Sequence, residues 1–265
     1  KPFESGFAGS VSYTYGESNK IFDGTSSQNS SQWRGIQTVN GKNSPNLPVT
    51  RSDFALGNRI VADASYQISW NDNVKTTFAL LYQGFQGSPF SFTYREGRDI
   101  FNDDSRDNAL IYVPRNASEI QFSGDAAEQA AQWARLDNFI NSVDHLNENR
   151  GGYADRNGSR GPWSHIVDLK LLQDFSFNMG NKKHTIQLTA DIFNFTNLLN
   201  KDWGRLKFVS GNVSPLTTVS TGATPVFSIN EGVMDDLGNP DCEQFDEQGS
   251  QSSRWQAQFG LRYIF

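Results

Sequence analysis

The C-terminal segment, Ser253 to Phe265, alternates between two kinds of side chain and constrains the fold more than any other part of the chain. One set of alternate positions is largely apolar and aromatic: Trp255, Ala257, Phe259, Leu261, Tyr263 and Phe265. The intervening positions are mostly polar, and a period of two predicts a β-strand with two different faces. A chain that ends in such a strand, on an aromatic residue, is typical of a bacterial outer-membrane β-barrel.

Five further segments repeat this pattern, at residues 7–15, 59–70, 74–83, 163–175 and 186–192. With its flanks, each is about as long as the 9–11 residues that a tilted strand needs to cross a bilayer. We therefore predict an all-β fold in which about six long antiparallel strands form a segment of a transmembrane barrel.

The charged residues of these strands all fall on one face. That polar face carries the candidates for lining the interior of a barrel: Arg59, Asp63, Lys75, Asp168, Lys170, Asp174, Asp191, Arg254 and Arg262. The opposite face carries no charge, and its most polar side chains are His165 and Gln173. Because a Lys or Arg facing lipid at mid-bilayer costs roughly 2–4 kcal/mol, a lipid-facing wall requires this segregation.

Tyrosine and tryptophan cluster towards the strand ends, which distinguishes a membrane barrel from a soluble sandwich. A soluble sandwich also segregates charge, because its inner face is dry. In a sandwich, these aromatic rings would be ordinary cross-strand pairs. Two belts of aromatic residues at the membrane interfaces explain their regular placement better. One belt contains Tyr13, Tyr15, Tyr82, Trp163 and Trp255, and the other Tyr66, Trp70, Phe175, Tyr263 and Phe265.

The composition agrees with a barrel and excludes other classes. The mean hydropathy of −0.57 is compatible with strands that show only alternate residues to lipid, and no apolar run reaches the length of a transmembrane helix. The net charge of −6 argues against a nucleic-acid surface. Cys242 is the single cysteine and forms no internal disulfide. Since no signal peptide begins at Lys1, we expect the sequence to be processed or a piece of a longer chain.

The connections between strands alternate between short and long. Residues 71–73 and 178–183 form short polar turns, whereas residues 17–55, 86–162 and 197–252 are long. Outer-membrane barrels have short periplasmic turns and long extracellular loops, so the C-terminus is expected on the periplasmic side.

The long connections carry some structure of their own. Asp125 and Glu128 form the capping signature of a helix, which continues with apolar residues at helical spacing to Val143 and is stopped by Gly151 and Gly152. Residues 23–47 are predicted as solvated loop. A hairpin within residues 203–230, using Leu206, Phe208 and Val226 onwards, is assigned to the third long connection. Six strands are too few for a closed barrel, so residues N-terminal to Lys1, or another chain, must supply the rest of the wall.

Several segments resemble TonB-dependent outer-membrane transporters, in particular the Oar-like group that carries a carboxypeptidase-regulatory-like domain. The resemblance is carried by Arg156–Trp163 with Asp168–Phe175, by Asp191–Asn200 with Asp202–Gly204, and by Phe259–Phe265. Shorter likenesses lie at Ala109–Pro114 and Ser31–Arg34. The resemblance covers nearly the whole chain and implies that residues 1–265 are the C-terminal portion of a 22-stranded barrel whose plug domain and earlier strands lie outside this chain.

The resemblance implies an outer-membrane protein of a Gram-negative bacterium that imports a bulky nutrient such as an oligosaccharide, a peptide or a metal chelate. Its partners would be outer-membrane lipid, the plug, TonB acting through the plug, and a surface lipoprotein lid. The resemblance also implies that Phe259, Leu261, Tyr263 and Phe265 form the recognition signal for the barrel-assembly machinery. Deleting Phe265 is then expected to reduce outer-membrane assembly while leaving synthesis intact. Unchanged assembly would contradict the role of these residues as a recognition signal.

The residues contain no convincing catalytic or metal site. Asp103, Asp104 and Asp107 are weak candidates for a Ca²⁺ site, because their spacing lacks the glycine and terminal glutamate of an EF-hand. A second acidic stretch at 235–247 is expected to be a charged loop. The histidines at positions 145, 165 and 184 lack metal-ligand spacing. We expect no enzymatic activity and no cofactor. The alternatives are a small outer-membrane barrel enzyme, which needs at least eight strands in this chain, and a soluble β-rich binding or adhesion module.

Overall fold

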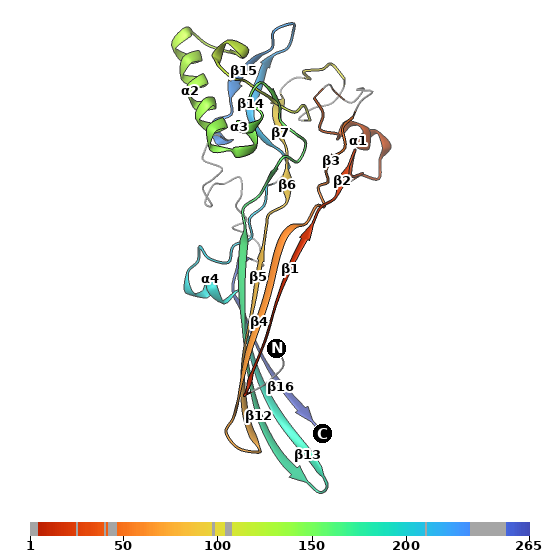
Figure 1. Cartoon of the computed structure of the whole chain (residues 1–265), viewed down its shortest axis with the longest axis vertical. Helices are drawn as coiled ribbons and strands as arrows, with labels where there is room; N and C mark the ends of the chain where they lie inside the picture. The colour runs from red at the N-terminus through yellow and green to blue at the C-terminus, as the bar shows by residue number, and fades with distance from the viewer. Residues whose placement is uncertain are drawn as a thin grey trace.

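Six long antiparallel strands form one curved sheet, as predicted. The computed structural model describes residues 5–24, 26–39, 41, 47–96, 99–103, 108–209, 211–233 and 253–265. The sheet has the order β1-β4-β5-β12-β13-β16. Each strand after β1 therefore pairs with the long strand that comes before it in the sequence. Figure 1 shows this sheet below a head built from the long connections, with both chain ends on the sheet side. The strands are β1 (Phe7–Gly16), β4 (Gly57–Ser69), β5 (Val74–Phe85), β12 (Ser164–Met179), β13 (Lys182–Phe193) and β16 (Gln256–Ile264).

Two tight hairpins join strands at the end of the sheet opposite the head. Between β4 and β5, Asn71 Oδ1 accepts hydrogen bonds from the backbone amides of Asn73 and Val74, both at 2.9 Å. Between β12 and β13, Gly180 adopts a left-handed conformation with φ of 64°. The sequence predicted a turn over residues 178–183. The two strands extend into this segment, because Met179 still pairs with Lys182.

The three long connections fold together as a head at the other end of the sheet (Figure 1). A four-stranded sheet of order β7-β14-β15-β9 forms its centre, and the long helix α2 lies beside it. The elements of the long connections are β2 (Asn19–Lys20), α1 (Asn29–Arg34), β3 (Thr50–Arg51), β6 (Pro89–Phe90), β7 (Phe92–Glu96), β8 (Tyr112–Val113), η1 (Ala117–Glu119), β9 (Gln121–Phe122), α2 (Ala126–Ser142), α3 (Asp144–Glu148), β10 (Gly152–Tyr153), β11 (Ser159–Arg160), α4 (Phe195–Leu199), β14 (Val213–Ser220), β15 (Val226–Ile229) and η2 (Glu231–Val233).

The hydrophobic core lies in the head and not against the six-stranded sheet. Strands β7 and β14 bury Phe92 and Leu216, and helix α2 adds Leu136 and Ile140. All four side chains are at most 1% exposed. The head is therefore a folded body with its own apolar interior, which is the requirement for ordering long connections.

The capping signature at Asp125 predicts the start of α2 correctly. Asp125 Oδ1 accepts from the amides of Ala127 and Glu128, and Glu128 Oε2 accepts from the amide of Asp125 at 2.8 Å. The predicted stop at Gly151 is wrong, because α2 ends at Ser142 and the short helix α3 follows.

Two further expectations about the long connections need correction. Helix α1 lies inside residues 23–47, which the polar composition predicted as loop. In the hairpin, Leu206 and Phe208 belong to no strand, and the first arm is β14. The hairpin does belong to the third long connection, as expected. The β-branched residues of β14 favour an extended backbone and explain why this segment forms the first arm.

Gly87 and Gly161 cross at the base of the head, where β5 and β12 pass into the long connections. A Cβ on Gly87 would lie 2.6 Å from the backbone of Gly161, whereas a Cβ on Gly161 would be 3.3 Å from Gly87. Neither glycine has a positive φ, so an alanine would not strain the backbone at either position. The two positions differ in how closely the added Cβ would approach the opposite backbone.

We therefore expect Gly87→Ala to destabilise the base of the head by about 1–3 kcal/mol, because the colliding atoms are backbone and cannot rotate away. Gly161→Ala is the matched control and should cost less. Hydrogen exchange of the amides at 86–88 and 159–161 measures the difference. Equal protection in the two variants would contradict the close crossing.

Candidate functional site

The apolar face of the six-stranded sheet is continuous and exposed. The strand register places apolar residues opposite one another in rows that run from edge to edge of the sheet. Val11 and Phe259, on the two edge strands, are 77% and 81% exposed. One such row contains Phe7, Tyr66, Phe78, Leu171, Ala190 and Phe259. An apolar surface of this extent is unusual for a protein in water and marks contact with a membrane or another protein.

The polar residues on this face are paired among themselves. Gln173 Oε1 accepts from the Thr76 hydroxyl at 2.6 Å, and its amide nitrogen donates to the Lys75 carbonyl oxygen at 3.0 Å. The indole nitrogen of Trp70 donates to Thr76 Oγ1 at 2.8 Å. In a lipid environment an unpaired polar group is costly, so this chain of bonds explains how Gln173 is accommodated on an apolar face.

A tyrosine–histidine pair lies near each end of the apolar face. Tyr82 Oη is 2.8 Å from His165 Nδ1 at the head end, and Tyr263 Oη is 2.6 Å from His184 Nδ1 at the turn end. The rings of each pair stack, and Trp163 stacks on His165.

The spacing of these two pairs matches the thickness of a bilayer. His184 is opposite Phe177 of β12, twelve residues along that strand from His165. At about 3.3 Å per residue and a tilt of about 40°, those twelve residues span about 30 Å along the membrane normal. The hydrocarbon core of a bilayer is about as thick, and amphipathic rings favour its two boundaries.

The opposite face gathers the charged residues predicted to line a barrel interior. Arg59, Asp63, Lys75, Asp168, Lys170, Asp174, Asp191 and Arg262 all lie in the long strands and share this polar face by register, whereas Arg254 lies just before β16. Lys170 Nζ forms an ion pair with Asp191 Oδ1 at 2.8 Å. Asp174 Oδ1 accepts from Gln187 at 2.8 Å, and Asp168 Oδ1 accepts from the amide of Asn194 at 2.7 Å. The polar face is thus a hydrogen-bonded surface, and it places Asp63, Asp168, Lys170 and Asp191 around a hollow of about 270 Å³.

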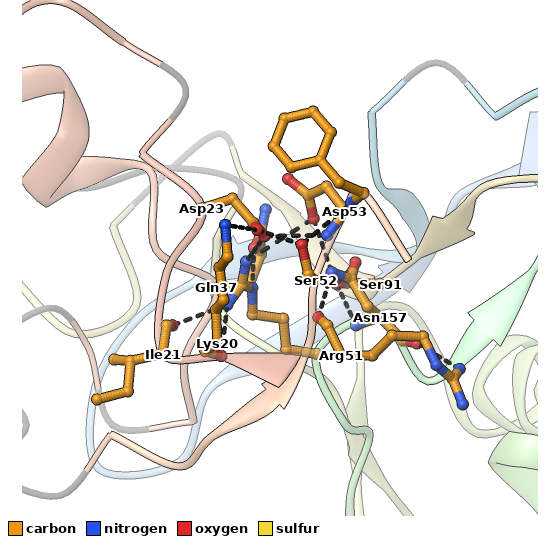
Figure 2. Close-up of polar contacts among 11 residues, drawn as sticks. Lys20, Ile21, Asp23, Gln37, Arg51, Ser52, Asp53, Ser91 and Asn157 are labelled. Carbon is orange, nitrogen blue, oxygen red and sulfur yellow. Dashed lines mark hydrogen bonds and ion pairs between the residues drawn. The ribbon is translucent and has the colours of Figure 1, made fainter. Parts of the chain in front are cut away.

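A buried ion pair holds the long connections together at the base of the head. The guanidinium of Arg156 donates to Asp23 Oδ2 at 2.5 Å, to the Ile21 carbonyl oxygen at 2.7 Å and to Gln37 Oε1 at 3.2 Å. The side chains of Arg156 and Asp23 are 3% and 0% exposed. Figure 2 shows that Ser52 and Asp53, from the same long connection, also donate to Asp23. The bond from Arg156 then links this carboxylate of the first long connection to the second.

The residues after Arg156 extend the same network. Asn157 adopts a left-handed conformation, and its side-chain amide donates to the Arg51 carbonyl oxygen at 2.8 Å and to Asp53 Oδ1 at 2.6 Å (Figure 2). Arg160 donates to the Ala55 carbonyl oxygen at 2.8 Å. This segment, which carries part of the resemblance noted from the sequence, acts as a clamp between the two connections.

The electrostatics of the clamp favour an ionised Asp23. Burial alone would raise the pKa of Asp23, but hydrogen bonds from the Ser52 hydroxyl and the Asp53 amide, together with the charge of Arg156, hold that pKa below its ordinary value. The carboxylate therefore remains charged at neutral pH, with Arg156 as its nearest cation and the half-exposed Lys20 Nζ at 4.0 Å from Oδ1.

His145 in α3 supports the clamp from the other side. Its Nε2 accepts from the amide of Asp155 at 3.1 Å, so the ring is neutral in this arrangement. Burial lowers the pKa of His145 below the ordinary value, with Asp155 and Glu148 opposing and Arg51 reinforcing the shift. The folded state thus binds a proton less readily than the unfolded chain.

We expect the head to lose stability as the pH falls below about 6.5, the ordinary histidine pKa. The lowered pKa means that the stabilisation from His145 is fully present above that value, and is lost as the pH falls towards the folded-state pKa. Melting temperatures of wild type and His145→Gln between pH 7.5 and 5.0 measure this effect. The wild-type melting temperature should fall more steeply, and parallel curves would contradict the role of His145.

The weak metal and catalytic candidates gain no support from the described residues. Asp103 lies in the head, while Asp104, Asp107, Cys242 and the acidic stretch 235–247 lie outside the described residues. Among the residues that the structure describes, no three His, Cys, Asp or Glu side chains come together as a metal site. No described helix has the length and apolar character needed to span a membrane.

Sequence reasoning missed three features. It did not place His184 on the apolar face, because β13 begins at Lys182 and not near Ile186. The Asp23–Arg156 pair joins residues far apart in the chain, and nothing local signals it. The Tyr–His pairs were detectable only once the register was known.

Comparison with known proteins supports the membrane interpretation. A family model described as an outer membrane beta barrel domain matches residues 1–219. No curated protein and no solved structure matches the chain. The match covers most of the chain, and the exposed apolar face, the opposite polar face and the aromatic ends agree with it. The chain belongs to the outer-membrane β-barrel domain family.

Proposed function

We propose that this chain is the C-terminal wall segment of a TonB-dependent transporter that imports a bulky nutrient across the outer membrane. The observation that carries the proposal is the open six-stranded sheet. Strands β1 and β16 are its edges, and no described strand pairs with the outer side of either. Since an open edge cannot face hydrocarbon, the sheet requires more strands to complete a wall.

The two faces of the sheet fit a large, filled barrel. The apolar face contacts lipid, and the charged face lines an interior in which a plug domain sits, as in 22-stranded outer-membrane transporters. The head is extracellular and the two hairpins are periplasmic, as short turns are in this class. Substrate is caught by the head, passes along the polar face and is released when TonB pulls the plug.

Two measurements test this proposal. The coding sequence upstream of Lys1 should encode a plug domain with a TonB box and about sixteen further strands. The protein purified from outer membranes should then bind the periplasmic domain of TonB, and deletion of the TonB box should abolish binding. A coding sequence with neither plug nor further strands would contradict the proposal and favour a small barrel.

A further inference from the structure

A pocket of about 100 Å³ lies beside the clamp, and residues of the first and the second long connection form its walls. Figure 2 shows two of the lining residues, Ile21 and Gln37, on one side of the clamp. The apolar part of the wall includes Ile36, Leu110 and Ala154, each at most 5% exposed. We call this the clamp pocket.

Two threonines in the wall of the clamp pocket each carry a hydroxyl that the fold does not use. The backbone of Thr38 is fixed, because its amide donates to the Asn108 carbonyl oxygen at 3.0 Å and its carbonyl oxygen accepts from Leu110 at 2.9 Å. Thr50 pairs with Lys20 between β2 and β3. Within the part of the chain that the structure describes, both Oγ1 atoms are buried and neither has a hydrogen-bond partner. Since an unpaired buried hydroxyl destabilises a fold, packing alone would favour valine at both positions.

A ligand in the clamp pocket supplies the missing partners. A threonine exchanges its hydroxyl and its methyl group by one rotation about the Cα–Cβ bond. The hydroxyl oxygens of Thr38 and Thr50 are covered by protein in this structure, and the rotation places each of them where its methyl group now is. A ligand group that both donates and accepts hydrogen bonds stabilises the rotated form, because it pairs a hydroxyl that is otherwise unpaired.

The other polar and aromatic groups of the clamp pocket suit the same kind of ligand. Gln37 Oε1 accepts from the Arg156 guanidinium at 3.2 Å, which fixes the side-chain amide and leaves its nitrogen as a donor. The ring of Tyr153 is 46% exposed, and the ring of Tyr112 holds it edge-on with the two centroids 5.4 Å apart. The clamp pocket thus combines an amide, two hydroxyls and an exposed aromatic ring with apolar walls.

We propose that the clamp pocket binds the edge of one sugar ring of an oligosaccharide, and that the next ring lies on Tyr153. Sugar hydroxyls both donate and accept hydrogen bonds, and the C–H groups of the ring pack against apolar and aromatic side chains. An anionic ligand would need an available cation, whereas Arg156, the cation in the wall, is already paired with Asp23.

The size of the clamp pocket limits how much of the ligand enters. An apolar cavity of about 150 Å³ holds one benzene molecule, so a pocket of about 100 Å³ admits the edge of a ring and not the whole ring. The inference rests on the proposed function, in which the head lies outside and captures a bulky nutrient, and it narrows that nutrient to an oligosaccharide.

Binding of neutral hexasaccharides to the full-length protein tests the proposal. The protein is purified from outer membranes in a detergent without a sugar headgroup, and the probes are maltohexaose, cellohexaose, mannohexaose and xylohexaose. Saturation-transfer NMR measures the affinity and identifies the ring that contacts the protein. Wild type should bind at least one probe, with the strongest transfer to a single ring. The double variant Thr38→Val, Thr50→Val should lose at least about tenfold in affinity, because each hydrogen bond contributes about fivefold.

Thr218→Val is the matched control. Thr218 also carries a buried hydroxyl without a partner among the described residues, but it does not line the clamp pocket, so this variant should bind as wild type. None of the three threonine substitutions should lower the melting temperature, since each removes an unpaired hydroxyl and retains the shape of the side chain. If the double variant does not fold, Tyr153→Leu, at an exposed ring, should still lose about fivefold in affinity.

Each contrary result has a definite meaning. Failure of all four hexasaccharides to bind wild type at millimolar concentration would overturn the proposal, and so would equal affinity in wild type and the double variant. Equal losses in the double variant and in Thr218→Val would assign the effect to the fold of the head and overturn it as well. TonB binding is measured on the same preparations. If sugar binding fails while TonB binding is intact, only this inference is lost, and the reverse result would remove the transporter and leave the sugar site.

Discussion

Arg156→Met is expected to destabilise the base of the head by about 3–5 kcal/mol, the usual cost of breaking a buried ion pair from one side. The substitution removes the buried cation beside the Asp23 carboxylate, whose side chain is 0% exposed, and leaves it the half-exposed Lys20 ammonium at 4.0 Å. It also removes the donor to the Ile21 carbonyl oxygen. Hydrogen exchange of the amides at 21–23, 51–53 and 156–158 should therefore accelerate at least about a hundredfold.

Two control variants separate the ion pair from a general effect of losing an arginine. Arg115→Met removes an exposed pair with Glu119, four residues away, and should cost about 0.3–0.5 kcal/mol. Arg156→Lys retains the charge but replaces the planar fork, whose three nitrogens donate to Asp23, Ile21 and Gln37, with a single ammonium group, so its cost should be intermediate. Unchanged exchange in Arg156→Met would show that the clamp does not hold the long connections.

Leu171→Arg is expected to cost about 2–4 kcal/mol in the membrane-inserted protein. Leu171 lies on the apolar face, midway along β12 between His165 and Phe177, the level of the bilayer centre. Its neighbours in the row are Phe78 and Ala190, and neither offers a partner for a guanidinium. Urea titration of the protein refolded into lipid vesicles measures the change in unfolding free energy.

Leu172→Arg is the matched control, since it is the same substitution one residue along the strand. Leu172 lies on the polar face between Thr77 and Thr189, with Asp174 two residues further on that face. An arginine there has a carboxylate within reach, so the cost should be below about 1 kcal/mol. Equal costs at the two positions would show that the two faces of the sheet meet the same environment.

The sequence predicts the long strands well because their pattern is local and repetitive. Alternation over residues 59–70 and 74–83 identifies β4 and β5, and the polar residues Asn71, Asp72 and Asn73 fix the turn between them. The face of each strand follows from the same alternation, which is why the charges were assigned to one face before the register was known. Likewise the N-terminus of α2 depends on only Asp125 and Glu128.

The head and its clamp depend on contacts between distant residues, so the sequence does not reveal them. Asp23 and Arg156 have no local pattern that relates them, and their pairing requires two long connections to fold against each other. The five-residue helix α4 is too short for a periodic signal, yet its Asn197 bonds both the turn that follows and the residue before β16. The crossing of Gly87 and Gly161 is visible only once both strands are placed.

Site-directed spin labelling tests the central claim, that lipid contacts the apolar face of the sheet, most directly. Single cysteines replace Phe78 on the apolar face and Ala79 on the polar face, in a Cys242→Ser background. Both positions lie in β5, which has a paired strand on each side, and Phe78 is 52% exposed. In lipid vesicles the label at position 78 should collide mainly with oxygen, and the label at 79 mainly with a water-soluble nickel chelate. Ready access of the nickel chelate to position 78 would contradict the membrane assignment.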